Sequence, residues 1–286
     1  MTARARALRI VLGAALFLAG PAVRSAHAQD ACAGAAPGLL PGGTTPADFA
    51  TVADPCGASD LTVRARGAFL IAPEMPDYYG SIVADAMMRA RRRINALSWL
   101  SLGLDLVTYR YVNNGGLASR GASFGPPTLG YHRTLHADGR RAVAGYARAL
   151  IPLDSARAHG VETGLELGAA LRQALGSHVG APRFVLQGGL SAALPLDIVA
   201  GQAHGRVEPG AAVELWFAAG PRLSLFGGGT TRFAIAPEPA FITAVPRAGA
   251  RLALSQRVWT SVLVELPVVG RDRTDLVASL FLGYSP

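Results

Sequence analysis

The chain has 286 residues, of which 50% are hydrophobic and only 16% charged, with 27 basic against 19 acidic side chains. Globular proteins carry about 25% charged residues, so this composition indicates long buried elements or membrane spans. The basic residues are all Arg and are dispersed along the chain, so we expect no nucleic-acid partner.

The first 28 residues have the pattern of a secretory signal peptide. Arg4, Arg6 and Arg9 precede the apolar stretch 10–19, and Ala26-His27-Ala28 forms a small-x-small cleavage site. The apolar stretch is too short to span a bilayer. We therefore predict export and removal of residues 1–28, which leaves 23 basic side chains against 19 acidic ones.

Residues 29–60 are rich in Ala, Gly, Pro and Thr, which predicts a linker or a small disulfide-closed tail on the periplasmic side, not a domain core. The two cysteines of the chain, Cys32 and Cys56, both lie in this segment. Because exported proteins meet oxidising conditions, we predict a disulfide between them. No third Cys and no His lies nearby, so we expect no metal.

From residue 61 onward, apolar residues recur at every second position. In 161–172, for example, the face that carries Leu165, Leu167 and Leu171 opposes the face that carries Glu162 and Glu166. Such alternation predicts strands. The longest uncharged run, 184–196, contains glycines and a proline, and no segment reaches the 18–20 or so apolar residues of a membrane helix.

Twelve segments show this alternation and form the predicted domain 61–286. They cover about 61–71, 80–92, 97–112, 126–136, 141–153, 160–174, 182–196, 206–218, 221–233, 247–256, 257–268 and 274–284. Short and longer connections take turns between them, as in transmembrane barrels with short periplasmic turns and longer outer loops. We predict an all-β fold, a closed antiparallel transmembrane β-barrel of about twelve strands, with ten as the alternative.

The direction of the apolar face separates a membrane barrel from a secreted β-sandwich or lipocalin-like barrel, in which the apolar face points inward. An Arg on the lipid face costs about 2–4 kcal/mol at the bilayer midplane. Six arginines share the polar phase of their strands, namely Arg64, Arg66, Arg89, Arg148, Arg232 and Arg251. We therefore predict that the apolar phase faces lipid; Arg133 falls on that phase and is expected to snorkel near a strand end.

The export signal, the alternating strands and the terminal strand ending at Tyr284 together resemble a Gram-negative outer-membrane β-barrel protein. The resemblance covers residues 61–286, is architectural, and implies location in the outer membrane with membrane lipid and the barrel-assembly machinery as partners. It also implies that Tyr284, an aromatic near the C-terminus, is the assembly signal, although Ser285 and Pro286 follow it here.

The inward phase carries charges of both signs, which have two interpretations. They line a polar route that sets ion or solute selectivity, or they form a cross-strand Arg–carboxylate network that fills and stiffens a narrow lumen. The candidate lumen-lining residues are Arg64, Arg66, Arg89, Asp105, Arg148, Glu162, Glu166, Arg172, Glu208, Glu214, Arg232, Arg251 and Glu265.

Other motifs carry little chemistry. His132 and His136 would lie about 13 Å apart on a strand, too far for one metal ion. Neighbouring Ser177 and His178 do not make a nucleophile–base pair by spacing alone. The run 227–229 lacks the Lys-Ser/Thr of a phosphate loop and is expected to make room for Trp216 or Trp259.

We therefore expect a channel or transporter for small solutes of unknown identity. A non-conducting structural or surface-interaction barrel is the alternative, and a barrel enzyme is the third hypothesis. We identify no catalytic residue and expect neither a cofactor nor enzymatic activity.

Overall fold

The structure, a computed structural model, describes only part of the chain. The described residues are 59–72, 79–95, 97–114, 117–123, 127–137, 141–151, 163–175, 184–199, 202–205, 207–220, 222–235, 241–255, 257–269 and 276–284. The predicted signal peptide and the predicted disulfide Cys32–Cys56 lie outside them.

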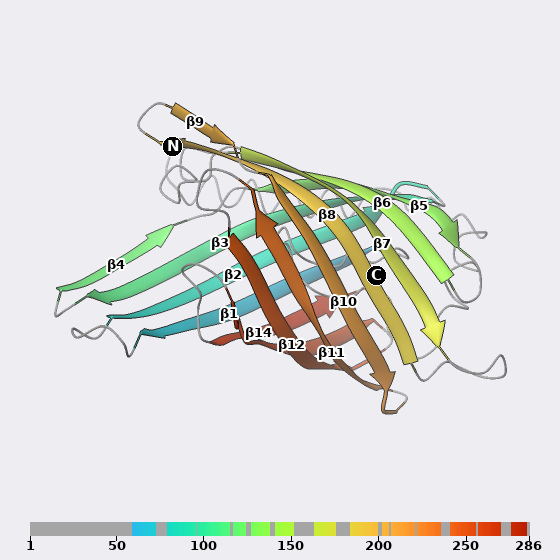
Figure 1. Cartoon of the computed structure of the whole chain (residues 1–286). Helices are drawn as coiled ribbons and strands as arrows, with labels where there is room; N and C mark the ends of the chain where they lie inside the picture. Colours follow the sequence, from blue (N-terminus) through green and yellow to red (C-terminus); the bar gives the residue numbers. More distant parts are fainter. Residues whose placement is uncertain are drawn as a thin grey trace, which may run out of the picture.

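The described residues form fourteen strands and one antiparallel sheet (Figure 1). The strands are β1 (Asp60–Ala72), β2 (Tyr79–Arg93), β3 (Ser98–Asn114), β4 (Leu117–Ser123), β5 (Thr128–Ala137), β6 (Arg141–Leu150), β7 (Thr163–Leu175), β8 (Phe184–Val199), β9 (Gln202–Gly205), β10 (Glu208–Ala218), β11 (Leu223–Ala234), β12 (Phe241–Ala253), β13 (Val258–Glu265) and β14 (Leu276–Tyr284). None of the described residues forms a helix that could cross a membrane.

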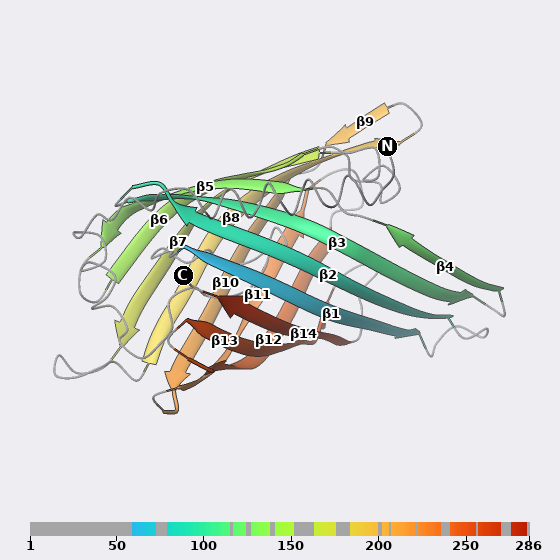
Figure 2. The ribbon, with the colours of Figure 1, turned by 180° about the vertical axis from the view of Figure 1, so that it is seen from behind.

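Twelve of these strands close into a barrel. Each pairs with its neighbours in chain order, β8 pairs with β10, and β1 pairs with β14 from Leu61↔Tyr284 to Phe69↔Leu276. This closure, visible from both sides in Figures 1 and 2, confirms the predicted twelve-stranded barrel. We call the end where β1 begins and β14 ends the turn end, and the opposite end the loop end.

Several predicted boundaries were wrong, and the largest difference is in β12. Strand β12 begins at Phe241, six residues before the expected start, and it contains Pro246. The carbonyl of Pro246 accepts a hydrogen bond from Leu266, beyond the end of the regular β12–β13 ladder at Arg247↔Glu265. The N–H and C=O of one residue in an antiparallel strand point to the same neighbouring strand. An N–H at position 246 would therefore point toward the chain that follows β13, beyond the regular ladder, so the proline removes no hydrogen bond of that ladder.

Two of the expected loops contain strands: β4 pairs with the end of β3, and β9 pairs with the end of β8. These hairpins extend beyond the barrel wall at the loop end (Figure 1). The expected strand 141–153 ends already at Leu150.

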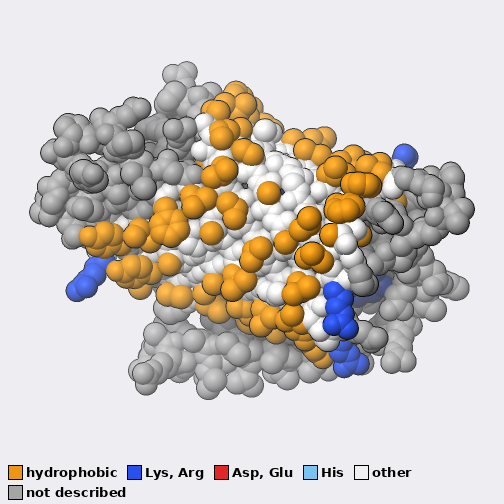
Figure 3. All heavy atoms as spheres, turned by 90° about the horizontal axis from the view of Figure 1, so that it is seen from below, with side chains coloured by type: hydrophobic (Ala, Val, Ile, Leu, Met, Phe, Trp, Pro, Cys, Tyr) orange, Lys and Arg blue, Asp and Glu red, His pale blue; other side chains and the backbone are white. Residues whose placement is uncertain are grey.

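The apolar phase faces outward, as predicted. In β14, exposed and buried residues alternate without a break, and Leu276, Leu280, Leu282 and Tyr284 are 37–55% exposed. Figure 3 shows one outer face covered with hydrophobic side chains, with arginines at its two ends and no Asp or Glu visible on its described part. Arg133 is exposed opposite Ser98, the first residue of β3, and thus lies at the turn end.

Two β-bulges change the facing of residues that simple alternation would assign. Leu106 has no partner in the pairing of β2 with β3, so Tyr109 falls on the outer phase and is 40% exposed. Strict alternation along the predicted strand 97–112 places it inward, with Trp99 and Asp105. Leu135 is the extra residue of β5, with no partner in its pairing with β6. His132 therefore points inward, whereas His136 points outward. One extra residue reverses every later side chain of a strand.

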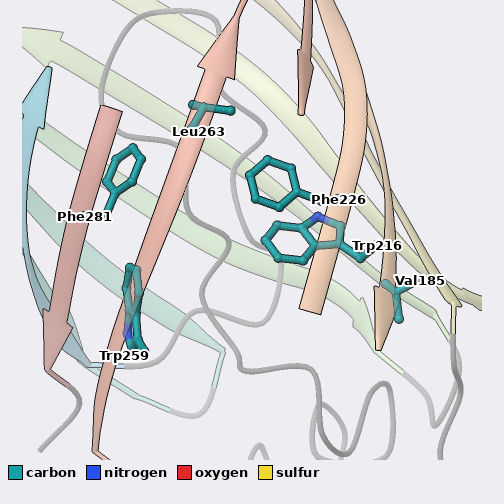
Figure 4. Packing of buried hydrophobic residues seen from close by; sticks show 6 residues of the cluster. All are labelled: Val185, Trp216, Phe226, Trp259, Leu263 and Phe281. Carbon is teal, nitrogen blue, oxygen red and sulfur yellow. The ribbon is translucent and has the colours of Figure 1, made fainter. Parts of the chain in front are cut away.

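Aromatic rings lie flat on glycines of the neighbouring strand. Tyr146 lies against Gly168, Phe226 against Gly249, and Trp259 against Gly283; each pair is directly opposed in register, and a Cβ at any of these glycines would overlap the ring. Figure 4 shows Phe226 and Trp259 in the cluster that Val185, Trp216, Leu263 and Phe281 complete on the inner wall.

The glycines 227–229 do not serve the tryptophans, contrary to expectation. Trp259 uses Gly283, and Trp216 stacks on Phe226 with ring centroids 4.4 Å apart. The lumen therefore has aromatic walls at its turn end, and the rings run along the wall.

Candidate functional site in the barrel lumen

The candidate site is the inner wall of the barrel. Among the described residues, the side chains of the predicted set point inward, because nearly all are buried or directly opposite a buried residue on the next strand. Arg89, for example, is opposite Thr62, which is 3% exposed. Arg232 is assigned by its contact with the buried Glu208. Glu162 lies outside the described residues.

Strands β1 and β2 hold the first group of charges. Asp85 accepts hydrogen bonds from Arg64 at 2.9 Å and from Arg66 at 2.5 Å. Nearer the turn end, the Nε atom of Arg91 donates to Asp60 at 2.8 Å, and both side chains are almost fully buried. These contacts follow from register, since Arg66 is opposite Asp85 and Asp60 is opposite Arg91.

Strands β6 and β7 hold a second group around Glu166, which is completely buried. Tyr146 donates to it at 2.8 Å, and Arg148 lies 3.6 Å from its other oxygen and 4.8 Å from the centroid of the Tyr146 ring. Next to this group, His132 is stacked between Trp99 and Tyr146. The result is one continuous polar and aromatic layer from β3 to β7.

A third group crosses β11 without using its side chains. Glu214, Gly228 and Arg247 are directly opposed on β10, β11 and β12. Because Gly228 has no side chain, Arg247 reaches Glu214 across it, with 2.7 Å between the charged atoms and 1% exposure of each side chain. Trp216 also donates to Glu214, at 3.0 Å. Gly228 thus makes room for an ion pair.

Two further arginines complete the inner wall. Arg232 donates to Glu208 at 2.9 Å, on the loop side of the Glu214 pair. Arg251 lies over the Trp259 ring, with 3.9 Å between its guanidinium carbon and the ring centroid. A guanidinium at this distance is attracted to the face of an indole ring.

The inward charges are sorted along the barrel axis. Seven inward arginines lie between two and six residues from the turn end of their strands. Within six residues of the turn end there are only two described inward carboxylates, Asp60 and Glu214. These arginines are Arg64, Arg66, Arg89, Arg91, Arg172, Arg247 and Arg251. Seven or more residues from the turn end, the described inward charges are two arginines and five carboxylates: Arg148, Arg232, Asp85, Asp105, Glu166, Glu208 and Glu265.

The two halves also differ in how tightly they are filled. At the turn end, Trp99, Glu214, Arg251, Trp259 and Phe281 are at most 2% exposed. Toward the loop end, small inward residues such as Ser191, Gly210, Ala212 and Thr243 are partly exposed. Among the side chains of the ion pairs described above, Arg232 in the loop half and Arg66 at the boundary between the halves are the more accessible, at 22% and 25%. The loop half is therefore the roomier part of the lumen.

Sequence reasoning missed part of this site. Asp60 was assigned to the segment 29–60, but it lies on β1 and accepts a hydrogen bond from Arg91 on the inner wall. Asp85, Arg247 and the aromatic residues Trp99, Tyr146 and Trp259 fall on the charged phase of their strands, so alternation gives their direction but not their partners. The described residues contain no group of three or more His, Cys, Asp or Glu side chains that could hold a metal ion.

Comparisons with solved structures show what this fold is similar to. The COG4313 outer membrane channel from Pseudomonas putida F1 matches 85% of this chain and 99% of its own, with 12% identity and a TM-score of 0.63. The β domain of the Bordetella autotransporter BrkA matches 80% of this chain and 100% of its own, with 12% identity and a TM-score of 0.54.

The translocator domain of the autotransporter NalP from Neisseria meningitidis matches 80% of this chain and 89% of its own, with 10% identity and a TM-score of 0.51. No protein-family model and no curated protein matches the sequence. The chain thus has the fold of bacterial outer-membrane β-barrels.

Proposed function

We propose that this barrel lies in the bacterial outer membrane and acts as a narrow channel for small polar solutes. One observation carries the proposal: the loop half of the lumen combines partly exposed small residues with an accessible charge, Arg232, and Arg66 is also accessible at its boundary with the turn half. Small inward side chains leave space in a barrel of this size, and charged ones hold water and ions there. The similarity in fold to a solved outer membrane channel supports this proposal.

The turn half would then be the constriction of the channel. Its inward side chains are large and almost fully buried, and Arg251 and Trp259 lie against each other there. Passage through this layer would select for small size and for charge. The lumen-lining role of the inward charges and the assembly role of Tyr284 remain predictions.

A second function, a non-conducting structural barrel, is favoured by the same burial. Buried cross-strand ion pairs such as Arg247–Glu214 stiffen a wall whether or not a solute passes. The two functions differ in one measurable property, which is the passage of ions through the folded protein.

Single-channel recording in planar bilayers tests the proposal. The mature folded protein is expected to give small, steady currents, because the lumen is polar but constricted. The variant Arg251→Ser should raise the conductance, since it removes a large side chain from the constriction. Arg133→Gln, on the outer phase at the same end, is the matched control and should leave it unchanged. Absence of current from wild type and from Arg251→Ser would favour the non-conducting barrel.

A further inference from the structure

The separation of inward charges along the axis defines the kind of solute that fits this lumen. Seven arginines against two carboxylates make the turn half positive, and five carboxylates against two arginines make the loop half negative, counted over the described residues. The barrel wall thus presents two charged layers of opposite sign in series.

Ion pairs lie within both layers and across the boundary between them. In the turn half Arg91 pairs with Asp60 and Arg247 with Glu214, and in the loop half Arg148 pairs with Glu166 and Arg232 with Glu208. Arg64 and Arg66 reach across the boundary to Asp85. Such pairs cancel charge locally and fix the side chains in place. The pairs within each half remove equal numbers of both signs, so by count the turn half keeps an excess of five arginines (seven minus two) and the loop half an excess of three carboxylates (five minus two).

A simple ion meets a repulsive layer in this lumen whatever its sign. An anion that enters from the loop end is repelled by the carboxylate layer. A cation that enters from the same end passes the carboxylate layer but is repelled by the arginine layer behind it. A molecule with a positive and a negative group can instead place each group at the layer of opposite sign. Complementary charges at a pore wall are how channels select among solutes.

The distance between the layers sets the size of such a solute. The arginines lie on average about four residues from the turn end, and the loop-half carboxylates about eight. Four residues of a strand tilted near 40° correspond to roughly 10 Å along the barrel axis. An extended tripeptide spans about the same length between its ends, roughly 10 Å.

We propose that the lumen selects short zwitterions, such as unblocked tripeptides, which lie along the axis with the carboxylate toward the arginine half and the ammonium group toward the carboxylate half. This inference rests on the proposed channel function and names its class of solute. Asp105 and Glu265, both partly exposed on the inner wall, would contribute to the recognition of the ammonium group.

Four forms of one peptide test the inference in proteoliposomes that contain the mature folded protein. Triglycine is a zwitterion, N-acetyl-triglycine an anion, triglycinamide a cation and N-acetyl-triglycinamide neutral, while the backbone is the same. Triglycine is expected to enter several-fold faster than either singly charged form. Equal entry of all four forms, or faster entry of a singly charged form, would overturn the inference while leaving the channel in place.

Entry of none of the four forms would overturn the zwitterion selectivity, and the single-channel recording of the same protein then decides whether the channel function falls with it. The double variant Asp105→Asn/Glu265→Gln should lower the rate for triglycine toward that for N-acetyl-triglycine. Arg257→Gln, which alters an exposed charge between β12 and β13 outside the lumen, is the matched control and should keep the wild-type preference. A double variant that keeps the full preference would contradict the role of these two carboxylates.

Discussion

Glu214 shows how a charged residue is accommodated in the wall of this barrel. Its carboxylate is 1% exposed, faces Arg247 across Gly228, and accepts a hydrogen bond from Trp216. A buried charge is tolerated only with such partners, because the cost of removing it from water is several kcal/mol. The pair depends on three consecutive strands, so it also ties β10, β11 and β12 together.

Removal of one partner should therefore destabilise the barrel. Glu214→Gln leaves Arg247 buried without its counter-charge, and we expect a loss of about 3–5 kcal/mol in the free energy of unfolding. The double variant Glu214→Gln/Arg247→Met should recover most of it, because no charge then remains buried. Urea titration of the folded barrel in lipid vesicles measures both. A single variant as stable as wild type would show that the pair is not needed.

At the level of the strands, glycines decide where the large side chains of the lumen lie. A glycine directly opposite an aromatic residue lets the ring lie flat on the next strand, as Trp259 does on Gly283. With side chains at these positions, the rings would have to point across the lumen. A glycine opposite an aromatic residue therefore improves the packing of the wall and also keeps the lumen wider.

A methyl group at Gly283 should displace the Trp259 ring. We expect Gly283→Ala to lower the stability by about 1–3 kcal/mol, as overpacking does, and to shift the tryptophan emission as the indole leaves its site. The control is Gly227→Ala, because nothing lies within 4 Å of a Cβ at Gly227. This control should stay within about 0.5 kcal/mol of wild type. Unchanged emission of Gly283→Ala would contradict the proposed contact.

The strands and their two faces could be predicted from the sequence, because period two is a local property that each segment carries by itself. The bulges at Leu106 and Leu135 could not, since an extra residue shows only in the pairing of two strands. This is why Tyr109 was expected on the wrong face. The start of β12 was missed because Pro246 reads as a strand breaker, and only the end of the β13 ladder explains why it is tolerated.

For the candidate site, the sequence predicted which side chains point into the lumen, but not which of them form ion pairs with each other. Inward residues such as Arg148 and Glu166 follow from alternation alone. Their pairing needs the register between neighbouring strands, and Arg247–Glu214 needs the register of three strands at once. The sorting of charges along the axis likewise requires the true ends of the strands.

The whole molecule is a barrel with an apolar outer face and a charged lumen. Its outer face determines how stable the folded barrel is in a bilayer. Leu280 lies near the middle of β14 and is 55% exposed, whereas Leu135 is 66% exposed near the turn end of β5. Both side chains are thus largely exposed on the outer face, but they contact different depths of the membrane.

Depth should therefore control the cost of a charge on this face. We expect Leu280→Arg to destabilise the folded barrel by about 2–4 kcal/mol and Leu135→Arg by about 0–1 kcal/mol. Unfolding in vesicles of defined lipid measures the difference between the two variants. Equal costs would mean that the outer face does not sit in the bilayer as described.

The pairing of β1 with β14 makes the final strand the piece that completes the ring. Until Leu276–Tyr284 arrives, β1 and β13 are both open edges whose backbone donors and acceptors find no substitute in hydrocarbon, at several kcal/mol for each unmet group. A chain that stops short of Leu276 gains little from its other eleven strands, because those two edges stay unsealed. Insertion of this protein should accordingly be a single late event governed by the nine residues Leu276–Tyr284.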